Sequence, residues 1–369
     1  MRILIDYRPA LRERTGVGEY AHELSAAVAS QLPLSHGLTL FSSSWKDRLH
    51  PGTIPNVPIV DARVPVTLLN LAWHRLGWPP VESFAGEVDI AHSMHPLLMP
   101  ARRAAQIVTI YDLYFLEQPQ NTAAEIKRDY PSLAGAHARQ ADAVITISEY
   151  TAAKIRSRLS VPAESIAICP PGAPAWRPAN RYQPRGPILF VGTIEPRKNI
   201  GRLLDAYATL LELVPDAPGL MLAGKAAPST ADVMARLAHP PFSGRVTHVG
   251  YVSGPEREDL YRQASMLVVP SLDEGFGMTA LEAMTIGIPV VASNRGALPE
   301  VTAGAALLVD PDDASALAGA MLRVLTEAST ARASIEQGLV RARHFTWAAS
   351  AERLRQAYAS AIERRRARR

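Results

Sequence analysis

Short apolar runs alternate with helix-like patterns along almost the whole chain. Residues 2–7 form an apolar run typical of a buried strand, and residues 19–32 follow with apolar side chains at every fourth position, which predicts a helix. Further strand candidates in the first half are LTLFSS, VDIAHS, AQIVTIYDL, ADAVITIS and SIAICP, and stretches 120–140 and 149–159 are helical or irregular. Parallel strands need crossover connections of about a dozen residues, usually helices. The first half is therefore expected to form an α/β sheet covered on both faces.

The second half repeats this alternation. Its strand candidates are PILFVGT, GLMLAGK, VTHVGYV, SMLVVPS, IPVVASN and AALLVD. Helices are expected over residues 198–214, 255–264, 277–286 and 313–328. Residues 170–187, between the two halves, are rich in Pro and Gly, which sustain neither a helix nor a central strand, so this stretch is interpreted as a linker.

The pattern predicts two doubly wound, Rossmann-like α/β domains, over residues 1–175 and 176–345, that face each other across a cleft. A length of 369 residues suits two domains. Ligands of such sheets bind beyond the carboxyl ends of the strands, so the chemistry is expected in the loops that follow them.

Composition points to a reducing compartment. The single cysteine, Cys169, excludes an intrachain disulfide, and without a cysteine partner it is expected to be a small buried apolar residue. The N-terminus lacks the apolar core of a signal peptide, and no apolar run approaches the roughly 20 residues that span a bilayer. These features predict a cytoplasmic protein, or one peripheral to the inner face of a membrane.

The net charge of +4 is concentrated at the C-terminus, where residues 346–369 hold seven arginines and two glutamates. A nucleic-acid-binding face would need basic residues spread over a folded surface, so no nucleic-acid partner is expected. The cluster that ends the chain predicts contact with an anionic membrane surface, and the alternative is a solvated tail. Its members are Arg364, Arg365, Arg366, Arg368 and Arg369.

Two glycines stand before the first expected helix, in TGVGEYA (residues 15–21). Backbone N–H groups at a helix N-terminus favour an anion, which makes Gly16 and Gly18 candidates for contact with a phosphate. The match of this segment to a dinucleotide fingerprint is weak because the loop from the first strand is long and no carboxylate follows the second strand. A plain flexible loop is the alternative.

A cation pair follows the first strand of the second half, in VGTIEPRKN (residues 191–199). Arg197 and Lys198 stand where a helix is expected to start, against the helix dipole, which suggests that they face an anion such as phosphate. The alternative is a solvated surface pair.

Two glutamates flank the start of another expected helix, in EGFGMTALE (residues 274–282). Glu274 precedes this helix and Glu282 lies inside it, and carboxylates accept hydrogen bonds from sugar and ribose hydroxyls. Glycines allow a ligand close to the backbone, and the first N–H groups of the helix are free donors. The alternative is an acid favoured by the helix dipole and an exposed helix residue.

These motifs together resemble glycosyltransferase family 4. VGTIEPRKNIGRLLDAY, LMLAGK, VTHVGYV, PSLDEGFGMTALEAMTIGIPVVASNRGALPEV and LLVDPDD fall in the family's order and spacing, and Glu274 and Glu282 match its E-x7-E signature. TGVGEY, TIYDLYFLEQP and ADAVITISEYTAAKI add a looser resemblance in the first half. Residues 345–358 resemble the closing helix that crosses back to the N-terminal domain. The resemblance implies the GT-B fold and a nucleotide-sugar donor as substrate.

The resemblance also implies roles for the selected residues. Arg197 and Lys198 would hold the donor pyrophosphate, Gly16 and Gly18 would close over it, and the base would lie near Val252. Glu282 would accept from the ribose hydroxyls. The transferred sugar would be held by Glu274 and by the backbone amides of Phe276, Gly277 and Met278.

One position departs from the family pattern, because members commonly carry His where Tyr111 precedes Asp112. Tyr111 can bond a sugar hydroxyl but cannot act as a base near neutral pH, and Asp112 would orient the acceptor or stabilise developing positive charge. His92 and His95 end another strand and are alternative candidates to face the cleft, although a lone histidine is more often structural. Asp310 and Asp312 formally match a metal-binding D-x-D, but a turn before a helix explains them.

The sequence therefore predicts a retaining, metal-independent glycosyltransferase without a cofactor, acting by a front-face mechanism. Resemblance of the EPRKN segment to bacterial mannosyl- and rhamnosyltransferases suggests GDP-mannose as donor and a saccharide or lipid-linked acceptor. A UDP-hexose donor is the alternative within the class. A GT-B epimerase, a phosphorylase or a non-catalytic nucleotide-binding subunit are the alternatives outside it.

Overall fold

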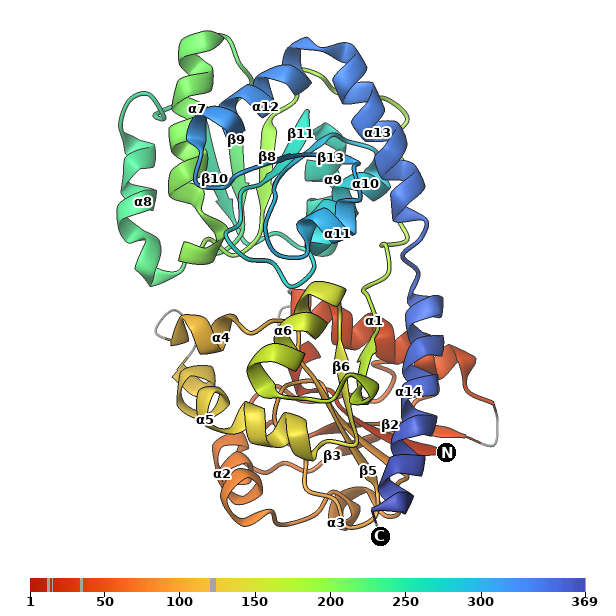
Figure 1. Ribbon diagram of the computed structural model, residues 1–369. Coiled ribbons are helices and arrows are strands. Elements are labelled where there is room, and N and C mark those ends of the chain that lie inside the picture. The colour runs from red at the N-terminus through yellow and green to blue at the C-terminus, as the bar shows by residue number, and fades with distance from the viewer. Residues whose placement is uncertain (12–13, 15, 34–35, 120–123, 369) are drawn as a thin grey trace. The chain divides into compact units, whose positions relative to one another are not determined.

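The structure is a computed structural model that describes residues 1–11, 14, 16–33, 36–119 and 124–368. The chain divides into two compact units, the first formed by residues 1–172 with 346–369 and the second by residues 173–345 (Figure 1). Three parts of the sequence predictions lie outside the described residues: Thr15, residues 120–123 and Arg369.

The first unit contains a parallel sheet whose described strands follow the order β3-β2-β1-β4-β5-β6-β7. The strands are β1 (Arg2–Asp6), β2 (Gly37–Ser42), β3 (Ile59–Asp61), β4 (Ile90–Ser93), β5 (Ala105–Thr109), β6 (Ala143–Thr146) and β7 (Ile166–Ile168). Its α-helices are α1 (Gly16–Gln31), α2 (Val66–Leu76), α3 (Glu82–Ala85), α4 (Tyr114–Glu117), α5 (Ala124–Gln140), α6 (Glu149–Leu159) and α14 (Trp347–Ala367). The described part of the unit also contains the 3₁₀ turns η1 (Arg8–Ala10) and η3 (Ala163–Ser165).

The second unit contains a parallel sheet with the strand order β10-β9-β8-β11-β12-β13. The strands are β8 (Ile188–Val191), β9 (Leu220–Ala223), β10 (Val246–Gly250), β11 (Met266–Val269), β12 (Val290–Ser293) and β13 (Ala306–Val309). Its α-helices are α7 (Ile200–Leu213), α8 (Ala231–Ala235), α9 (Gly254–Gln263), α10 (Met278–Ile286), α11 (Leu298–Thr302), α12 (Ala314–Thr326) and α13 (Ala328–Ala342). The 3₁₀ turns are η4 (Pro196–Lys198), η5 (Pro228–Thr230) and η6 (Arg236–Ala238).

Both sheets reverse their strand order beside the first strand of the unit. β1 pairs with β2 on one side and β4 on the other, and β8 pairs in the same way with β9 and β11. In doubly wound sheets a ligand binds at this switch point, beyond the carboxyl ends of the strands. The predicted pair of doubly wound α/β sheets is confirmed, and the segments after β1, β4, β8 and β11 become the places to look for a site.

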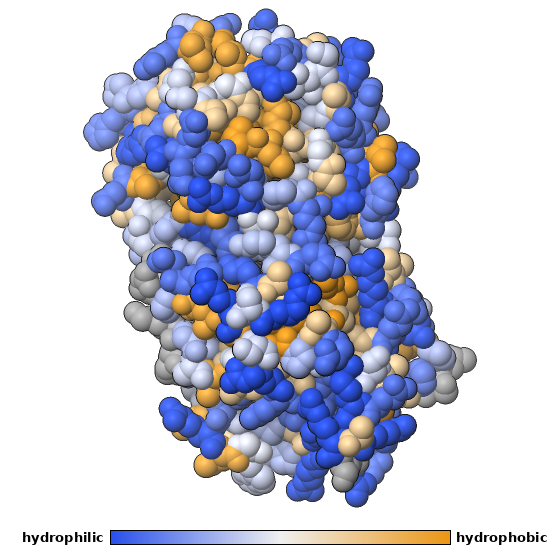
Figure 2. Space-filling view, viewed as in Figure 1, coloured by the Kyte–Doolittle hydropathy of each residue, from blue (hydrophilic) through white to orange (hydrophobic). Residues whose placement is uncertain are grey.

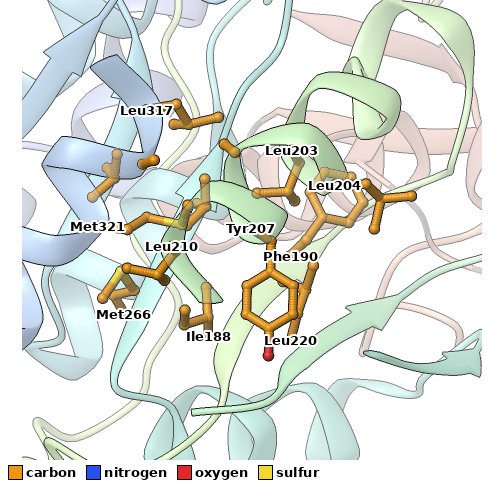
Figure 3. Close-up of a cluster of buried hydrophobic side chains, with 14 of the residues drawn as sticks. Ile188, Phe190, Leu203, Leu204, Tyr207, Leu210, Leu220, Met266, Leu317 and Met321 are labelled. Carbon is orange, nitrogen blue, oxygen red and sulfur yellow. The ribbon is translucent and has the colours of Figure 1, made fainter. Parts of the chain in front are cut away.

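The apolar stripe predicted after β8 forms the centre of the second unit's core. Leu203, Leu204, Tyr207 and Leu210 of α7 are fully buried against sheet residues such as Phe190 (Figure 3). Their spacing of three and four residues places them on one face of the helix. Tyr207 completes its burial by donating its hydroxyl hydrogen to the Pro218 carbonyl at 2.9 Å. The core fixes the strand end from which the candidate site projects.

The C-terminal helix belongs to the first unit, as the sequence predicted. α14 packs against α1 and against β5, β6 and β7, and the chain returns to this unit at Thr346 (Figure 1). Trp347 contacts Tyr20 edge-on with 5.8 Å between the ring centroids, and the Tyr358 hydroxyl lies 2.7 Å from Nδ1 of His92. The helix is therefore part of the first unit's core.

The basic C-terminus is held by protein groups of the first unit. The Arg364 Nε donates to the Asp142 carbonyl at 2.6 Å, and Arg368 Nη1 lies 3.2 Å from Oδ1 of the Asp142 side chain. Arg365 also reaches the carboxylate of Asp142, at 4.0 Å. The alternative of a free solvated tail is wrong for residues 364–367, which continue α14. Among the described residues, no helix combines the length and apolar character that crossing a bilayer requires.

The stretch interpreted as a linker is largely built into the second unit. Residues 170–187 contain no helix or strand, as expected, but the boundary between the units falls between Gly172 and Ala173. The Tyr182 hydroxyl donates to the Ser265 carbonyl at 2.9 Å, and its ring packs on the core of the unit. Proline and glycine suppressed secondary structure here without preventing packing.

Candidate active site

Arg197 and Lys198 follow β8, the strand beside which the second sheet reverses its order. They lie in η4, and α7 begins only at Ile200, so the expected helix start at residue 198 is wrong by two residues. Asn199 separates the two helical segments because it adopts a left-handed conformation with φ of 58°. Its side-chain amide donates to the carbonyls of Pro270 at 3.2 Å and Pro311 at 2.8 Å. Both cations are therefore fixed at the sheet edge rather than on the first turn of α7.

Glu274 contacts both cations from the loop after β11. Lys198 Nζ lies 2.5 Å from Oε1 of Glu274, Arg197 Nη1 lies 3.8 Å from Oε2, and the Ser271 hydroxyl donates to Oε1 at 2.7 Å. Burial would raise the pKa of the Glu274 carboxyl group, but the charges of Lys198 and Arg197 and the hydrogen bonds outweigh it and lower the pKa. The structure thus joins three of the predicted site residues into one charge cluster, with the carboxylate ionised.

The guanidinium of Arg197 is also oriented by groups that the sequence reasoning did not select. Its Nε and Nη2 lie 3.1 and 2.9 Å from Oε1 of Glu195, and Nη1 lies 3.4 Å from the Asp273 carbonyl. The side chains of Arg197 and Lys198 keep exposed fractions of 16% and 15%. An anionic ligand can therefore reach both cations, but it must compete with carboxylates that already hold them.

Glycines shape the backbone around this charge cluster. Gly277 has φ of 99° and precedes α10, and a Cβ there would lie 2.7 Å from Leu298 Cδ2. A Cβ on Gly296, which has φ of 66°, would lie 2.5 Å from the backbone nitrogen of Glu274. Phe276 is buried, and Met278 begins the helix, so the backbone N–H groups there have no partner within α10. The sequence prediction did not include Gly296, although this residue follows the end of β12.

Glu282 is buried inside α10 and already has two donors. Arg257 Nη2 lies 3.2 Å from its Oε1, and the Tyr261 hydroxyl donates to Oε2 at 2.8 Å. Trp176 packs against both partners, with its ring 5.7 Å from the Arg257 guanidinium carbon and 5.8 Å from the Tyr261 ring. The alternative of an exposed helix residue is wrong, since Glu282 is 4% exposed. Arg257 and Tyr261 were missed, although their spacing of four residues on α9 places them on one helix face.

Val252 lies half-buried in the loop after β10, where the base of a nucleotide was expected. Tyr251, next to it, is 40% exposed, and Lys225 Nζ lies 5.5 Å from the centre of its ring. Tyr251 and Lys225 were not selected from the sequence. They provide an aromatic surface and a positive charge beside the expected position.

The switch point of the first unit carries a second cluster of charged groups. Asp6 is the last residue of β1, and its carboxylate accepts hydrogen bonds from Arg8. Arg8 Nε lies 2.8 Å from Oδ1, Arg8 Nη2 lies 2.5 Å from Oδ2, and Nε2 of His95 lies 3.1 Å from Oδ2. Burial alone would raise the pKa of Asp6, but the charge of Arg8 and the hydrogen bonds lower it well below its usual range. Asp6 and Arg8 were missed, although charged residues directly after the first strand were the available signal. Of the two candidate histidines, His95 is the one at this edge.

His92 is not at the edge. It is fully buried between the Tyr358 hydroxyl, 2.7 Å from Nδ1, and the Thr109 hydroxyl, 2.8 Å from Nε2. Burial lowers the pKa of His92 to about 3, so the ring is neutral. The candidate cleft role of His92 is wrong and its structural alternative is confirmed, because Nδ1 connects β4 to α14 and Nε2 connects β4 to the neighbouring strand β5.

Tyr111 and Asp112 follow β5. The Tyr111 hydroxyl donates to the Met94 carbonyl at 3.2 Å, and its ring meets Tyr20 edge-on with centroids 5.4 Å apart. Burial raises the pKa of Tyr111 far above its usual value, which agrees with a phenol that is not a base. Oδ1 of Asp112 accepts from the Tyr114 N–H at 3.1 Å at the start of α4.

We expect Asp112→Ala to lower the rate of sugar transfer more than Tyr111→Phe. The phenol hydrogen bond is worth about 0.5–1.5 kcal/mol, whereas a bond to a charged group is worth about 1.5–3 kcal/mol. Steady-state transfer rates at saturating and limiting acceptor check this order, with thermal unfolding of both variants as the folding control. Parent rates and unchanged acceptor dependence in both variants would contradict the placement of the acceptor.

Gly16 and Gly18 lie inside the first turn of α1 rather than before it. The helix begins at Gly16, three residues earlier than expected, so both glycines carry N–H groups of the helix terminus. A Cβ on Gly18 would lie 2.8 Å from the Pro9 carbonyl oxygen, which explains why no larger residue stands there. Gly18 thus has a packing role, and the phosphate role of both glycines remains a prediction.

Asp310 and Asp312 contact Arg295. Its Nη2 lies 3.1 Å from Oδ1 of Asp310 and 2.7 Å from Oδ2 of Asp312, and the cap of α12 is Asp313. This agrees with the structural interpretation of the two aspartates. Cys169 is buried, as expected, and burial raises its pKa to about 12.

Comparisons with known proteins match both halves of the chain to glycosyltransferase families. Residues 14–177 match the family model Glycosyltransferase Family 4, and residues 185–327 match Glycosyl transferases group 1. The O-antigen chain mannosyltransferase B of Escherichia coli is 27% identical over 94% of this chain and 96% of its own length. A D-inositol 3-phosphate glycosyltransferase of Corynebacterium efficiens is 31% identical over 58% of this chain and 53% of its own length.

Among solved structures, sucrose-phosphate synthase from Thermosynechococcus elongatus is similar, with a TM-score of 0.75 at 24% identity over 97% of this chain and 98% of that one. The two parallel-sheet units and these matches define a glycosyltransferase of the GT-B class. Within that class, the chain belongs to glycosyltransferase family 4.

Proposed function

We propose that the protein is a retaining, metal-independent mannosyltransferase that moves mannose from GDP-mannose to a saccharide or lipid-linked acceptor. The observation that carries the proposal is the cluster of Arg197, Lys198 and Glu274, in which two cations and one ionised carboxylate meet at the β8/β11 switch point. The similarity to an Escherichia coli mannosyltransferase over 94% of the chain supports mannose as the sugar. Bacterial polysaccharide or glycolipid synthesis is the corresponding process.

In this proposal the two cations exchange partners when the donor binds. Arg197 and Lys198 turn from Glu274 to the diphosphate, because two phosphates offer more negative charge and more acceptor atoms than one carboxylate. The carboxylate that they release accepts from hydroxyl groups of the mannose. In the free protein the cluster is thus a donor site whose cations are neutralised by Glu274. Glu282, which pairs with Arg257, accepts from the ribose hydroxyls.

The chemical step is a front-face displacement. The bond from C1 of the mannose to the β-phosphate oxygen breaks, and its electron pair stays on the phosphate. Arg197 and Lys198 stabilise the charge that grows there, together with the N–H groups at the start of α10. The acceptor hydroxyl oxygen bonds to C1 on the same face and gives its proton to the departing phosphate. The product keeps the α configuration, and Asp112 orients the acceptor.

A thermal-shift screen against GDP-, UDP-, dTDP- and ADP-sugars tests the donor. GDP-mannose is expected to stabilise most, since a ligand at 100 times its Kd adds about 2.7 kcal/mol. A larger shift and turnover with a UDP-hexose would replace the donor assignment and leave the class intact. Epimerised free donor, or absorbance from a bound pyridoxal phosphate, would indicate the other GT-B enzymes. Donor binding without hydrolysis or transfer would indicate a non-catalytic subunit.

A further inference from the structure

Large apolar side chains are exposed together on and just after α2 in the first unit. Leu68, Leu71, Leu76 and Trp78 have exposed fractions of 58%, 59%, 75% and 63%. They are four of the twelve large hydrophobic side chains that are exposed in the described part of the chain, and they fall within eleven residues. Figure 2 shows orange atoms at its lower left, in the region where Figure 1 draws α2.

The helix is apolar on two of its faces. Leu69 and Trp73, four residues apart, are buried in a core cluster with Leu4 and Phe41, and this face fixes α2 to the sheet. Leu68 and Leu71 lie three residues apart on a different stripe, which the unit does not cover. Gly77 ends the helix with φ of 60°, and exposed Trp78 follows. We call Leu68, Leu71, Leu76 and Trp78 the α2 patch.

The segment that carries the α2 patch contains arginines and no acidic residue. Residues 62–81 contain Arg63 and Arg75 and no aspartate or glutamate. Both arginines are exposed, and the nearest acid before the segment, Asp61, lies 2.6 Å from Nη2 of Arg48. Arg75 lies on the same helix face as Leu68 and Leu71, because it follows them by seven and by four residues. Within residues 62–81 the exposed apolar side chains are therefore accompanied by two arginines and by no carboxylate.

We propose that the α2 patch docks the first unit onto an anionic lipid bilayer. Leucine side chains enter the boundary between head groups and acyl chains, Trp78 takes the interfacial position that Trp favours, and Arg63 and Arg75 meet lipid phosphates. A second copy of the patch is a less suitable partner than a bilayer. Two patches in contact would bring arginines together, and residues 62–81 contain no carboxylate that could pair with them.

The docking surface differs from the one that the sequence alone suggested. Arg364, Arg365 and Arg368 at the C-terminus donate to carbonyl and carboxylate groups of the first unit. A lipid phosphate would have to displace those bonds, and α14 exposes no large hydrophobic side chain. The α2 patch combines exposed apolar surface and positive charge, which interfacial binding requires together. This inference stands independently of the donor assignment.

Vesicle sedimentation of the full-length protein tests the proposal. Vesicles of phosphatidylglycerol with phosphatidylcholine are compared with vesicles of phosphatidylcholine alone. The variant L68S/L71S/L76S is expected to lower partitioning about tenfold. R63Q and R75Q should each lower it about fivefold, and added salt should weaken the parent protein in the same direction. The matched control is L213S/V340S in the second unit, where the replaced side chains are 57% and 58% exposed.

Thermal unfolding and donor binding of each variant separate lost docking from lost folding, because the replaced leucines are exposed. Equal sedimentation of the parent and the α2 variant would overturn the proposal, as would a parent that sediments with neither vesicle. Loss of binding in R366Q alone would assign the membrane contact to the C-terminus instead. A parent dimer that becomes monomeric in L68S/L71S/L76S, with vesicle binding unchanged, would assign the patch to a second copy.

Discussion

Replacement of Lys198 by methionine is expected to lower kcat for mannosyl transfer by about 10² to 10³, the loss that follows removal of one preorganised group facing a developing anion. Lys198 Nζ is placed at the sheet edge by η4 and is held 2.5 Å from Glu274 before the donor arrives. Methionine keeps the unbranched apolar stem and removes the charge together with the N–H donors that carry it. Steady-state transfer from GDP-mannose, with initial rates over donor concentration, gives kcat and KM separately.

The same substitution removes the closest partner of a buried carboxylate. Glu274 would keep Ser271 at 2.7 Å and Arg197 at 3.8 Å, so its charge is less well compensated and the free energy of unfolding is expected to fall. The double variant Lys198→Met/Glu274→Gln removes that charge too and should recover stability. It should not recover kcat, because no cation returns to the phosphate. Recovery of kcat along with stability would show that Lys198 acts through folding alone.

A matched control lies on the next helix. Arg202 belongs to α7, its side chain is 39% exposed, and its Nη1 lies 3.6 Å from Oδ2 of the surface residue Asp205. Arg202→Met removes one positive charge close in sequence and should leave kcat and KM at parent values. If Lys198→Met changed only the donor KM, Lys198 would bind substrate and transition state equally, and the proposed stabilisation of the leaving phosphate would be wrong.

The sequence predicted the sheets well because buried parallel strands are continuous apolar runs. Ile188–Val191 and Met266–Val269 are buried at every position, and such runs stand out between helical patterns. The sequence pattern did not reveal β3 or α2, and the reason differs between the two. β3 has three residues, each partly buried, and α2 has apolar side chains on both its buried and its exposed faces, which hides its period. Residues 170–187 contain the boundary between the units, but much of the stretch packs on the second unit, because packing does not require secondary structure.

Site residues that directly follow a strand could be predicted from the sequence. Residues that reach the site from a separate helix could not be predicted as well. Arg197, Lys198 and Glu274 each stand just beyond a strand end, so the topology alone brings them together. Arg257 reaches Glu282 from a different helix, and only the packing of α9 against α10 creates that ion pair. His92 and His95 are three residues apart, yet one is buried in the core and the other lies at the sheet edge. Their positions depend on where β4 ends.

Glu274→Gln is expected mainly to lower kcat, and Glu282→Gln mainly to raise the KM for the donor. In the proposed complex Glu274 faces the sugar, whose charge changes in the reaction, whereas Glu282 faces the ribose, whose charge does not. An interaction that strengthens only in the transition state appears in kcat, and one that is equal in both states appears in KM. A hydrogen bond to a charged group is worth about 1.5–3 kcal/mol. That corresponds to about 10- to 150-fold in either parameter.

Glutamine is the replacement of choice because both carboxylates are buried and already bonded. Glu282 contacts Arg257 and Tyr261, so alanine would leave a cavity and remove the carboxylate beside Arg257, whereas glutamine keeps the shape and one acceptor oxygen. Thermal unfolding checks that each variant is folded. Glu258→Gln is the charge-matched control, since Glu258 pairs with Arg262 at 2.5 Å on the same α9 and should leave both parameters unchanged.

The same assay tests whether a metal is needed. Arg197 and Lys198 supply the positive charge that a divalent cation would otherwise bring to the diphosphate, so EDTA should leave most activity intact, and NMR of the product should show the α configuration of the donor. Equal changes of kcat and KM in both glutamine variants would contradict the assignment of one carboxylate to the sugar and the other to the ribose. Activity abolished by EDTA and restored by Mn²⁺, or an inverted product, would mean that the phosphate leaves by another route. The cation pair would then bind the donor without promoting the departure of the phosphate.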